Sequence, residues 1–327
     1  MSGSSVHSPP PVLTPAAELT ALLTRHATEP GLQSTAVPGL HLYRAVAQSE
    51  PVHTVYTPSV CLVAQGRKLV RQGEAAMPYG PDDLLLISVS LPLTAQILEA
   101  SPEKPHLALH VDLDPALIAA LALESPAAPN AGGQSGLVVT ALEPLVQDAI
   151  LRLVRLLDTP QHIPVLAPLI LRELAYLLLV GPEGGRLRAM VQTAGQTHRI
   201  ITAVERLVRE YDRPLRVEQM ARDVHMSVSG FHHHFKAVTA LSPVQFQKRL
   251  RLLEARRLLL NREVDVTRAG ARVGYDSPSQ FSREYRRLFG VSPRQDVARW
   301  HVAGSLTEFP VSLPVHSTAT PLALVRA

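Results

Sequence analysis

An internal repeat in the last third of the chain constrains the fold more than any other feature. When residues 221–249 are shifted by fifty positions, their aromatic, turn and capping residues fall on equivalents in residues 271–299. The aligned pairs include Phe231 with Phe281, Phe235 with Tyr285, Ser227 with Ser277, and Pro243 with Pro293. Such self-similarity means that one small structural unit occurs twice, and each copy is expected to form a helix, a tight turn and a second helix.

The first copy shows why the repeat predicts a helix-turn-helix unit. Its opening helix covers about Val217–Val224, and the turn follows at His225–Met226. Ser227 is then expected to cap the second helix, because its hydroxyl can accept a hydrogen bond from a backbone N–H that has no partner inside the helix. The apolar spacing of that helix predicts an inward face made of Phe231, Phe235 and Val238.

The second copy repeats this arrangement around a glycine. Its opening helix, about Thr267–Val273, leads into Gly274, which can adopt a turn conformation that other residues resist. Small residues in the opening helices, Ala221 and Ala271, are expected to let the two helices of each unit cross closely. Between the copies, residues 243–260 predict one long helix that would fix the distance between the units.

Charge is distributed unevenly along the chain. Residues 1–196 hold 11 Lys and Arg against 16 Asp and Glu, whereas residues 197–300 hold 20 against 11. A basic region joined to an acidic one is expected when only the basic region meets a polyanion. A plain helical bundle with a solvated basic surface is the alternative, but it does not explain the arginines and short polar residues on the outward faces of both second helices. The repeat and the charge together predict nucleic-acid binding.

The N-terminal half has a different texture, which predicts strands. From residue 39 to 113, short apolar or alternating runs are broken by Pro, Gly, Asp and Ser, as in an antiparallel sandwich or barrel. Two helices are predicted over residues 142–157 and 165–180; the second is apolar nearly all round and is therefore a core helix or a subunit interface. Residues 125–136 predict a loop.

These patterns give the expected fold class and domain order. The fold class is α+β: an N-terminal antiparallel β-barrel or sandwich with helices, followed by an all-α double helix-turn-helix domain. The expected segments are a disordered tail over 1–15, a regulatory domain over 16–185, a linker over 186–197, a DNA-binding domain over 198–300 and a C-terminal tail over 301–327.

Two long motifs in residues 199–300 identify a family. The first copy reads VEQMARDVHMSVSGFHHHFKAVTALSPVQFQ, and the second reads GYDSPSQFSREYRRLFGVSP. This region resembles the AraC/XylS family of bacterial transcription regulators. The resemblance implies two helix-turn-helix units in successive major-groove faces of double-stranded promoter DNA, with a contact to RNA polymerase. By domain order, the N-terminal half is similar to the family's regulatory domains, which implies a cupin-like barrel that binds a small-molecule effector and helices that form a homodimer.

The resemblance assigns DNA-contacting positions residue by residue. In the first unit the base-reading positions fall at Ser229, His232 and His233, and in the second they fall at Ser279, Ser282 and Arg283. A guanidinium such as that of Arg283 can bind guanine O6 and N7 with two parallel hydrogen bonds. Phosphate contacts are expected at Lys236, Arg286 and Arg287, which would set the register without reading sequence. The sequence departs from the family at His233, where arginine is common, so the base preferred there stays open.

The histidines do not follow the patterns of metal sites. In the run 232–234, adjacent helical side chains point about 100° apart, and the usual i and i+4 histidine pair is absent. The histidines of the β-rich half lack the H-x-H pattern of metal-dependent cupin enzymes and predict surface or core residues: His41, His53, His106 and His110. We therefore expect no metal and no cofactor.

The single cysteine and the absence of catalytic motifs bear on enzymatic activity. Cys61 alternates with apolar neighbours in TPSVCLVAQG and predicts a buried small hydrophobe. The alternative, a redox or electrophile sensor, requires an accessible and reactive thiolate. One cysteine excludes an internal disulfide. No P-loop, G-x-S-x-G or G-x-G-x-x-G motif occurs, so the sequence does not predict an enzyme.

The sequence as a whole predicts a cytoplasmic, sequence-specific DNA-binding transcription regulator that responds to an effector, with activation favoured by the family. The N-terminus lacks a basic region followed by an apolar stretch, so no secretory signal is expected, and no uninterrupted apolar run reaches the length of a membrane span. Two alternatives stay open. One is a cupin-type enzyme with an appended DNA-binding module, and the other is a constitutive architectural DNA binder.

Overall fold

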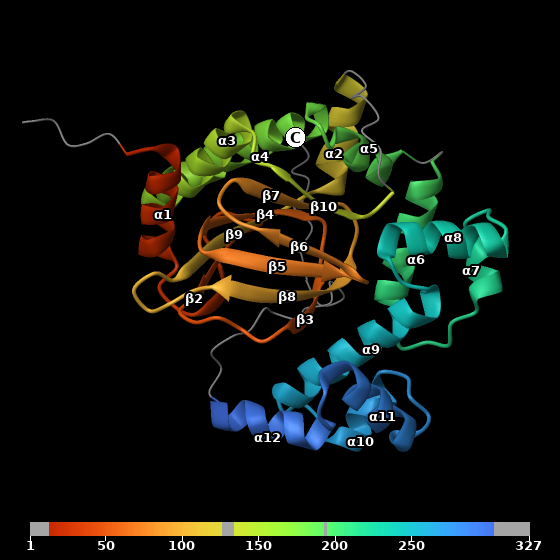
Figure 1. The fold of residues 1–327 in the computed structure, drawn as a ribbon. Coiled ribbons are helices and arrows are strands. Elements are labelled where there is room, and N and C mark those ends of the chain that lie inside the picture. Colours follow the sequence, from red (N-terminus) through yellow and green to blue (C-terminus); the bar gives the residue numbers. More distant parts are fainter. Residues whose placement is uncertain (1–12, 126–133, 193–194, 304–327) are drawn as a thin grey trace, which may run out of the picture.

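The computed structural model describes residues 13–125, 134–192 and 195–303, which form a β-rich half followed by a helical half (Figure 1). The expected fold class is confirmed, because an antiparallel two-sheet region with flanking helices precedes an all-α region. The tails predicted over 1–15 and 301–327 and the loop predicted over 125–136 lie largely outside the described residues.

Two antiparallel sheets build the β-rich half. The first has the strand order β1-β2-β9-β4-β7-β10, and the second has the order β3-β8-β5-β6. The strands are β1 (Gly31–Ser34), β2 (Leu40–Ala45), β3 (Val52–Tyr56), β4 (Ser59–Gln65), β5 (Arg67–Gln72), β6 (Ala75–Tyr79), β7 (Asp83–Ile87), β8 (Leu91–Glu99), β9 (His106–Asp112) and β10 (Leu137–Ala141). The predicted succession of short strands is therefore present, and the sheets enclose a shared apolar interior.

In the described ranges, five helices flank the sheets. They are α1 (Pro15–His26), α2 (Pro115–Glu124), α3 (Pro144–Arg155), α4 (Ile163–Val180) and α5 (Gly184–Val191). Most of them lie over the first sheet, and α1 contacts β4 and β9 directly (Figure 1). This cover explains why β4 and β7 read as continuous apolar runs rather than as alternating ones, because both of their faces are buried. The two predicted helices correspond to α3 and α4, whereas α2 and α5 were not predicted.

The long apolar helix α4 has two different faces. Its inner face, with Ala167 and Leu174 almost fully buried, packs against α3. Its outer face, named here the α4 face, consists of Val165, Leu169 and Tyr176, which are 67%, 60% and 42% exposed. Among the described residues, Pro160–Val180 is the one helical stretch long and apolar enough to span a membrane. Its packed inner face is typical of a core helix, and its exposed face is an apolar surface.

Seven helices build the other half within the described residues. They are α6 (Gln196–Arg209), α7 (Val217–Asp223), α8 (Val228–Thr239), α9 (Pro243–Leu260), α10 (Val266–Arg272), α11 (Pro278–Phe289) and α12 (Pro293–Ala303). The predicted repeat is present as two units, α7–α8 and α10–α11, joined by the long helix α9 (Figure 1). Ser227 and Ser277 cap α8 and α11 as predicted, because their hydroxyls accept hydrogen bonds from Gly230 and Gln280.

One detail of the predicted repeat is wrong. Ala221 is fully buried in α7 as expected, but Ala271 is exposed, and Gly270 occupies the crossing of the second unit instead. A Cβ added to Gly270 would lie 3.1 Å from the ring of Phe281. The close approach therefore depends on Gly270 rather than on its neighbour.

The cause of this error is a difference of one residue between the two turns. The backbone N–H of Met226 closes the first turn on the carbonyl of Ala221, and that of Tyr275 closes the second on Gly270. The offset between the copies is thus forty-nine before the turn and fifty after it. Asp276 is the additional residue, and a single shift of fifty misaligns the opening helices.

The boundary between the two apolar cores does not coincide with the boundary between the β-rich half and the helical half. One large core extends from the β-rich half through α6 into the first helix-turn-helix unit and includes Phe231, Phe235 and Phe246. A second, smaller core holds the other unit together around Leu252, Phe281 and Tyr285. The first unit is therefore packed as a continuation of the β-rich half, and the second unit is packed around its own aromatic residues.

Candidate functional site

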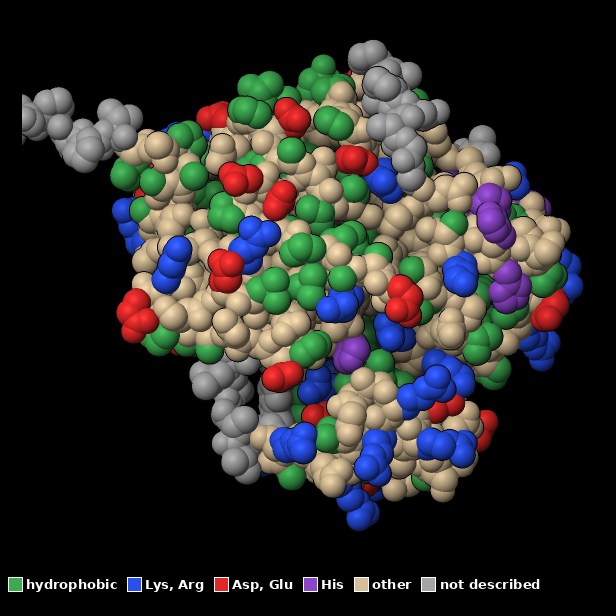
Figure 2. Space-filling model, viewed as in Figure 1, with side chains coloured by type: hydrophobic (Ala, Val, Ile, Leu, Met, Phe, Trp, Pro, Cys, Tyr) green, Lys and Arg blue, Asp and Glu red, His purple; other side chains and the backbone are tan. Residues whose placement is uncertain are grey.

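The second helices of the two units, α8 and α11, present polar faces to solvent. Eight of the nine positions assigned to DNA contact are exposed, and Ser282 is half-buried. The exposed positions are Ser229, His232, His233, Lys236, Ser279, Arg283, Arg286 and Arg287. Figure 2 shows histidine side chains gathered over the first unit and lysine and arginine side chains over the second. Sequence reasoning thus placed these residues on the outward faces of the expected helices.

Positive charge on these faces is not neutralised within the described part of the protein. Within the described ranges, no ion pair is formed by Lys236, Arg283, Arg286 or Arg287. The acid of α11, Glu284, is occupied elsewhere, because its carboxylate accepts hydrogen bonds from Lys248 at 2.7 Å and from the hydroxyl of Tyr275 at 2.9 Å. The outward face of α11 therefore combines three guanidinium groups that pair with no acid of the described chain, which suits a polyanion.

The three adjacent histidines separate in space because they lie on a helix. His232 and His233 are exposed, whereas His234 is half-buried with its ring 5.2 Å from that of His233. Phe231 and Phe235, at 0% exposure, hold the opposite face of α8 in the core. In the part of the chain that the structure describes, no group of three His, Cys, Asp or Glu residues has a metal-binding arrangement.

Helix α9 holds the two units at a fixed separation. It begins with a capping box in which Ser242 and Gln245 each bond the other's backbone N–H. Its Arg251 donates to the carbonyls of Tyr211 and Gly274 at 2.7 and 2.6 Å, which ties the segment before α7 to the turn of the second unit. Its Arg256 donates to the buried carboxylate of Asp296 at 2.7 Å. Charge-assisted bonds of this kind orient the elements that they join.

A cavity of about 890 Å³ lies between the two sheets and helix α6. Strands of both sheets supply most of its wall, and α6 contributes Ile201, Glu205, Val208 and Arg209. Ligand pockets have volumes of about 300–1,000 Å³ with mostly apolar walls and a few polar groups. This cavity, named here the barrel cavity, has such walls, so it is a candidate site for a small molecule.

A row of polar residues crosses one wall of the barrel cavity. Strand register places Ser34 opposite His41, His41 opposite His110, and His110 opposite Cys61, on β1, β2, β9 and β4. Asp112 follows His110 by two residues and therefore points to the same side of β9. All five residues line the cavity.

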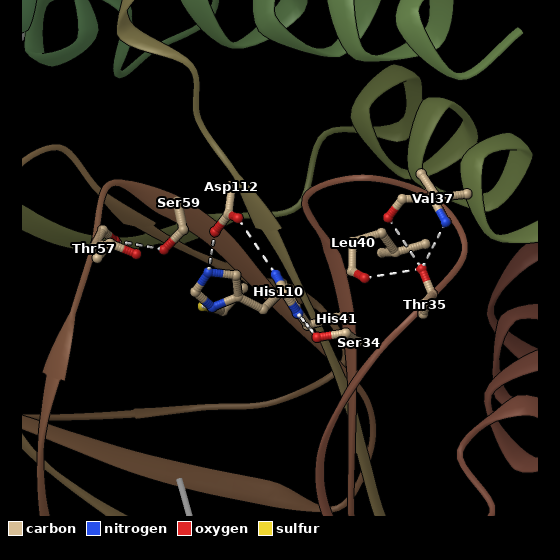
Figure 3. Close-up of polar contacts among 10 residues, drawn as sticks. Ser34, Thr35, Val37, Leu40, His41, Thr57, Ser59, His110 and Asp112 are labelled. Carbon is tan, nitrogen blue, oxygen red and sulfur yellow. Dashed lines mark hydrogen bonds and ion pairs between the residues drawn. The ribbon is translucent and has the colours of Figure 1, made fainter. Parts of the chain in front are cut away.

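Hydrogen bonds link this row to the carboxylate of Asp112 (Figure 3). His110 Nε2 lies 2.9 Å from one carboxylate oxygen, and His41 Nε2 lies 3.3 Å from the other. His110 Nδ1 lies 3.6 Å from the Sγ of Cys61. Burial opposes ionisation of Asp112, but the hydrogen bonds from the two histidines hold the pKa of its carboxyl well below the usual range.

The opposite sheet places a lysine and two tyrosines against the same cavity, and Tyr43 of the first sheet also lines it. Lys68 is 4% exposed, and its Nζ lies 5.5 and 5.6 Å from the ring centres of Tyr43 and Tyr56. Burial lowers the pKa of Lys68 to about 7, although the nearby Cys61 opposes this shift. Tyr79 pairs with Lys68 across β5 and β6 and also lines the cavity. Sequence reasoning missed this lysine; the signal was its position in phase with the buried Val70 on a strand.

The remaining histidines of the β-rich half have structural environments. His106 is fully buried next to Tyr43, and burial lowers its pKa to about 3. His53 packs edge-on against Phe289 of α11, with ring centres 5.7 Å apart, and its Nδ1 lies 2.9 Å from the hydroxyl of Thr94. His53 therefore joins β3 of the second sheet to the second helix-turn-helix unit.

The first unit is joined to the β-rich half through its backbone. The carbonyl of Val238, in the last turn of α8, accepts hydrogen bonds from Gln72 Nε2 at 3.0 Å and from the backbone N–H of Gly136 at 2.9 Å. Gln72 is buried and is held in turn by the hydroxyl of Ser135 at 2.8 Å. Helix α6, a wall of the barrel cavity, also packs against α8 and α9.

Comparison with known families agrees with this architecture. Residues 36–186 match the model of the AraC-type transcriptional regulator N-terminus, and residues 220–299 match a helix-turn-helix domain model. Together these matches cover most of the β-rich half and nearly all of both helix-turn-helix units. The chain belongs to the AraC family of transcription regulators.

Curated relatives in the family include regulators from two genera. The chain is similar to the HTH-type transcriptional regulator ExsA of Pseudomonas aeruginosa, with 30% identity over 162 residues, 48% of this chain and 56% of ExsA. It is also similar to the virulence regulon transcriptional activator VirF of Yersinia enterocolitica, with 27% identity over 160 residues, 49% of this chain and 58% of VirF. The matched part thus spans just over half the length of these relatives.

Among solved structures, the chain resembles ToxT from Vibrio cholerae. A crystal structure of wild-type ToxT with bound unsaturated fatty acid matches with a TM-score of 0.51 and 9% identity, over 79% of this chain and 94% of that one. A crystal structure of an apo ToxT variant matches with a TM-score of 0.53 and 9% identity, over 81% of this chain and 99% of that one. At this identity the likeness concerns the fold, which supports the arrangement of the two halves of this AraC-family chain.

Proposed function

We propose that this AraC-family chain is a sequence-specific DNA-binding regulator of transcription, and that occupancy of the barrel cavity controls its DNA-binding half. The observation that carries the proposal is the position of α6. One helix forms part of the cavity wall and also packs against α8, the reading helix of the first unit, and against α9. A ligand that contacts α6 therefore reaches the DNA-binding half without an intermediate element.

The DNA-binding part rests on the outward faces of α8 and α11. In this proposal Ser229, His232, His233, Ser279, Ser282 and Arg283 read bases, and Lys236, Arg286 and Arg287 hold phosphates. The exposure of these side chains and the cations of α11, which pair with no acid of the described chain, support the assignment. Phe235 of α8 packs against Phe246 of α9 with ring centres 5.5 Å apart, and Phe281 of α11 shares a core with α9. This packing on one helix supports two units that would meet successive faces of one duplex.

The regulatory part rests on the barrel cavity. Its volume fits a small molecule, and its wall carries polar groups from both sheets. The ToxT structure with bound unsaturated fatty acid supports the idea that a chain of this fold holds a small apolar ligand. An effector shifts the protein only if it binds one arrangement of α6 better than another. The family's members are transcription regulators rather than enzymes, which supports an effector site rather than an active site in this cavity.

The partners expected from the family form a further part of the proposal. The α4 face, with Val165 and Leu169 exposed, is an apolar surface that suits a second copy of the chain in a homodimer. The names of relatives such as the activator VirF support activation, which implies a contact with RNA polymerase at the promoter. Promoter binding places the protein in the cytoplasm.

One selection experiment tests the DNA-binding and dimer proposals together. The full chain is incubated with a library of genomic fragments, and the bound fragments are sequenced. A sequence-specific regulator should enrich one motif, and a homodimer should enrich fragments that carry the motif twice at fixed spacing. The double variant Val165→Glu, Leu169→Glu, which charges the α4 face, should keep the motif and lose the requirement for its second copy.

Two outcomes contradict these proposals separately. Equal recovery of all fragments would indicate the constitutive architectural binder and would overturn sequence-specific regulation. A single-copy motif with the unaltered chain, unchanged in the charged variant, would leave sequence-specific binding intact and overturn the dimer. Sedimentation of both proteins without DNA gives the oligomeric state independently.

A further inference from the structure

The Cys61–His110–Asp112 group has the arrangement of an activated thiol. A carboxylate only accepts hydrogen bonds, so the short contact between Asp112 and His110 Nε2, at 2.9 Å, requires the proton to lie on that nitrogen. Nδ1 of His110 is then the atom that faces Cys61 Sγ at 3.6 Å, and it can take the thiol proton. This is the relation of nucleophile, base and orienting acid found in covalent catalysis.

The electrostatic environment favours this proton transfer. Burial alone would lower the pKa of His110, but the charge on Cys61 and the hydrogen bond to Asp112 raise it to about 10. The contacts with Asp112 and Cys61 thus place His110 where it can take the thiol proton when Cys61 reacts. The side chain of Asp112 is 49% exposed and that of His110 is 18% exposed, whereas Cys61 is buried at the cavity. The group thus extends from the solvent to the interior of the barrel.

A second group at the cavity points to the kind of ligand. The hydroxyl of Tyr56 is buried, has no hydrogen-bond partner among the described residues, and belongs to a side chain that is only 6% exposed and lines the cavity. A buried donor without a partner is costly, so a ligand that brings an acceptor oxygen is stabilised there. Tyr56 also lies close enough to Cys61 for the charge on Cys61, after burial, to raise its pKa.

The geometry points to Cys61 as a covalent sensor that captures small α,β-unsaturated carbonyl compounds inside the barrel cavity. Cys61 supplies the nucleophile, His110 carries the proton, and the hydroxyl of Tyr56 donates to the carbonyl oxygen of the bound compound. This inference names the effector class of the cavity and so rests on the proposed function. Cys61 is buried as expected, but this inference favours the alternative of an electrophile sensor over a hydrophobe that only packs.

The reaction is a conjugate addition that needs no further reactant. The thiol proton passes to His110 Nδ1, and Sγ forms a bond to the β-carbon of the unsaturated compound. The π electrons of the carbon–carbon double bond move to the α-carbon and carbonyl oxygen, giving an enolate that Tyr56 stabilises. His110 then returns the proton to the α-carbon. The net result is addition of sulfur and hydrogen across the double bond, with no oxidant and no leaving group.

The position of Cys61 explains how such an adduct would affect the DNA-binding half. The new group would occupy the cavity, part of whose wall is formed by Ile201 and Val208 of α6. Cys61 is the single cysteine of the chain, so an internal disulfide is excluded. Its burial favours a small molecule that enters the cavity over a protein thiol as the reactant.

The test measures adduct formation on the intact chain with acrolein and methyl vinyl ketone as probes. Mass spectrometry of the whole protein should show one adduct, formed faster than that of free cysteine at the same pH. His110→Gln should slow the reaction about a hundredfold, the scale of a lost acid–base group. Cys61→Ala should form no fast adduct.

A matched control separates Tyr56 from simple access to the cavity. Tyr56→Phe should slow capture of methyl vinyl ketone about tenfold, and it should leave the reaction of Cys61 with iodoacetamide unchanged, because that alkylation expels iodide and needs no donor to an enolate. Equal slowing of both reactions would overturn the role of Tyr56. Thermal melting of each variant checks that the fold is retained.

The outcomes distinguish this inference from the proposed function. The expected result is a fast single adduct that changes the affinity for the selected DNA motif at least several-fold. A reaction no faster than that of free cysteine, with motif binding intact, overturns the sensor and leaves the proposed function standing. A fast adduct that does not alter DNA binding overturns sensing. Repeated turnover of the probe would overturn the sensor as well and would instead indicate an enzyme.

Discussion

The two helix-turn-helix units share a plan but differ in how they are attached and charged. The first unit belongs to the large core of the β-rich half, and the last turn of α8 is bonded to Gln72 and Gly136 through the carbonyl of Val238. The second unit has its own core and meets the β-rich half at the His53–Phe289 contact. The outward face of α8 carries one lysine and two histidines, whereas that of α11 carries three arginines.

This difference suggests a division of work between the units. The arginines of α11 supply positive charge, which contributes a large share of the affinity for DNA. The first unit contributes less charge, but α6 and Gln72 at the end of β5 connect it to the barrel. We therefore expect the second unit to determine how tightly the protein binds and the first unit to determine when it binds.

The largest expected difference in stability comes from substitutions in the turns of the two units. Gly274 has a φ of +88°, and an added Cβ would lie 2.1 Å from the carbonyl oxygen of Asp212. Gly274→Ala should therefore destabilise the second unit by about 3 kcal/mol, the combined cost of a left-handed conformation and a clash. The equivalent residue of the first unit, His225, already has a φ of 55°, so His225→Gly should change stability by less than about 0.5 kcal/mol.

Calorimetry and hydrogen exchange would check this pair of variants. If the cores are independent, Gly274→Ala should loosen α10 and α11 while the barrel keeps its protection. A single cooperative loss of protection over both halves would show that the second unit is not an independent core and would remove the basis of the comparison.

Substitutions in the two reading helices, α8 and α11, should cause different kinds of loss in DNA binding. Arg283→Ala should cost about 1–3 kcal/mol at the selected motif and relax the preference at one base pair. Replacement of both His232 and His233 by Ala should cost about 1 kcal/mol and change the preferred bases under α8. Arg287→Ala is the control for a phosphate contact, and it should weaken binding to all sequences and reduce the salt slope by about 0.9. Uniform loss with Arg283→Ala would contradict base reading.

The smallest expected effect is on the pH dependence of docking of the second unit. Burial, aided by Arg249 and Arg256, lowers the pKa of His53 from 6.5 to about 4, against an opposing hydrogen bond with Leu288. The docked state thus binds fewer protons than the separated state between these values. Docking should be strongest above about pH 6.5, weaken as the pH falls towards 4, and lose about 1 kcal/mol by pH 5.5.

Hydrogen exchange of β3 and α11 at pH 7.5 and 5.5 would measure this loss. The variant His53→Phe keeps an aromatic ring against Phe289 and cannot titrate, so its docking should not depend on pH in this range. An equal pH dependence in the variant would assign the effect to another group.

Local patterns made much of the helical half predictable from sequence. The caps at Ser227 and Ser277, the inward aromatic residues and the left-handed turn at Gly274 are all set by residues within one or two turns of each other. The error at Ala271 has the same origin, because a one-residue insertion in a turn does not change the pattern on either side of it.

The cavity group was not predictable, because strand register brings it together. Cys61 and His110 are 49 residues apart, and their contact depends on the pairing of β4 with β9. The tie between Gln72 and Val238 joins residues 166 apart and depends on the packing of whole halves. Periodicity predicts which face a residue occupies, but it does not specify which strand lies beside it.

Helix α6 contacts both the barrel cavity and the DNA-binding helices. The coupling that it provides therefore also acts from the DNA to the cavity. Binding free energies at two coupled sites are reciprocal, so any factor by which a ligand in the barrel changes the affinity for DNA is also the factor by which DNA changes the affinity for that ligand. A chain bound at its promoter would then hold its ligand with a different strength from a free chain in the same cell. The promoter itself would act as an effector of the barrel.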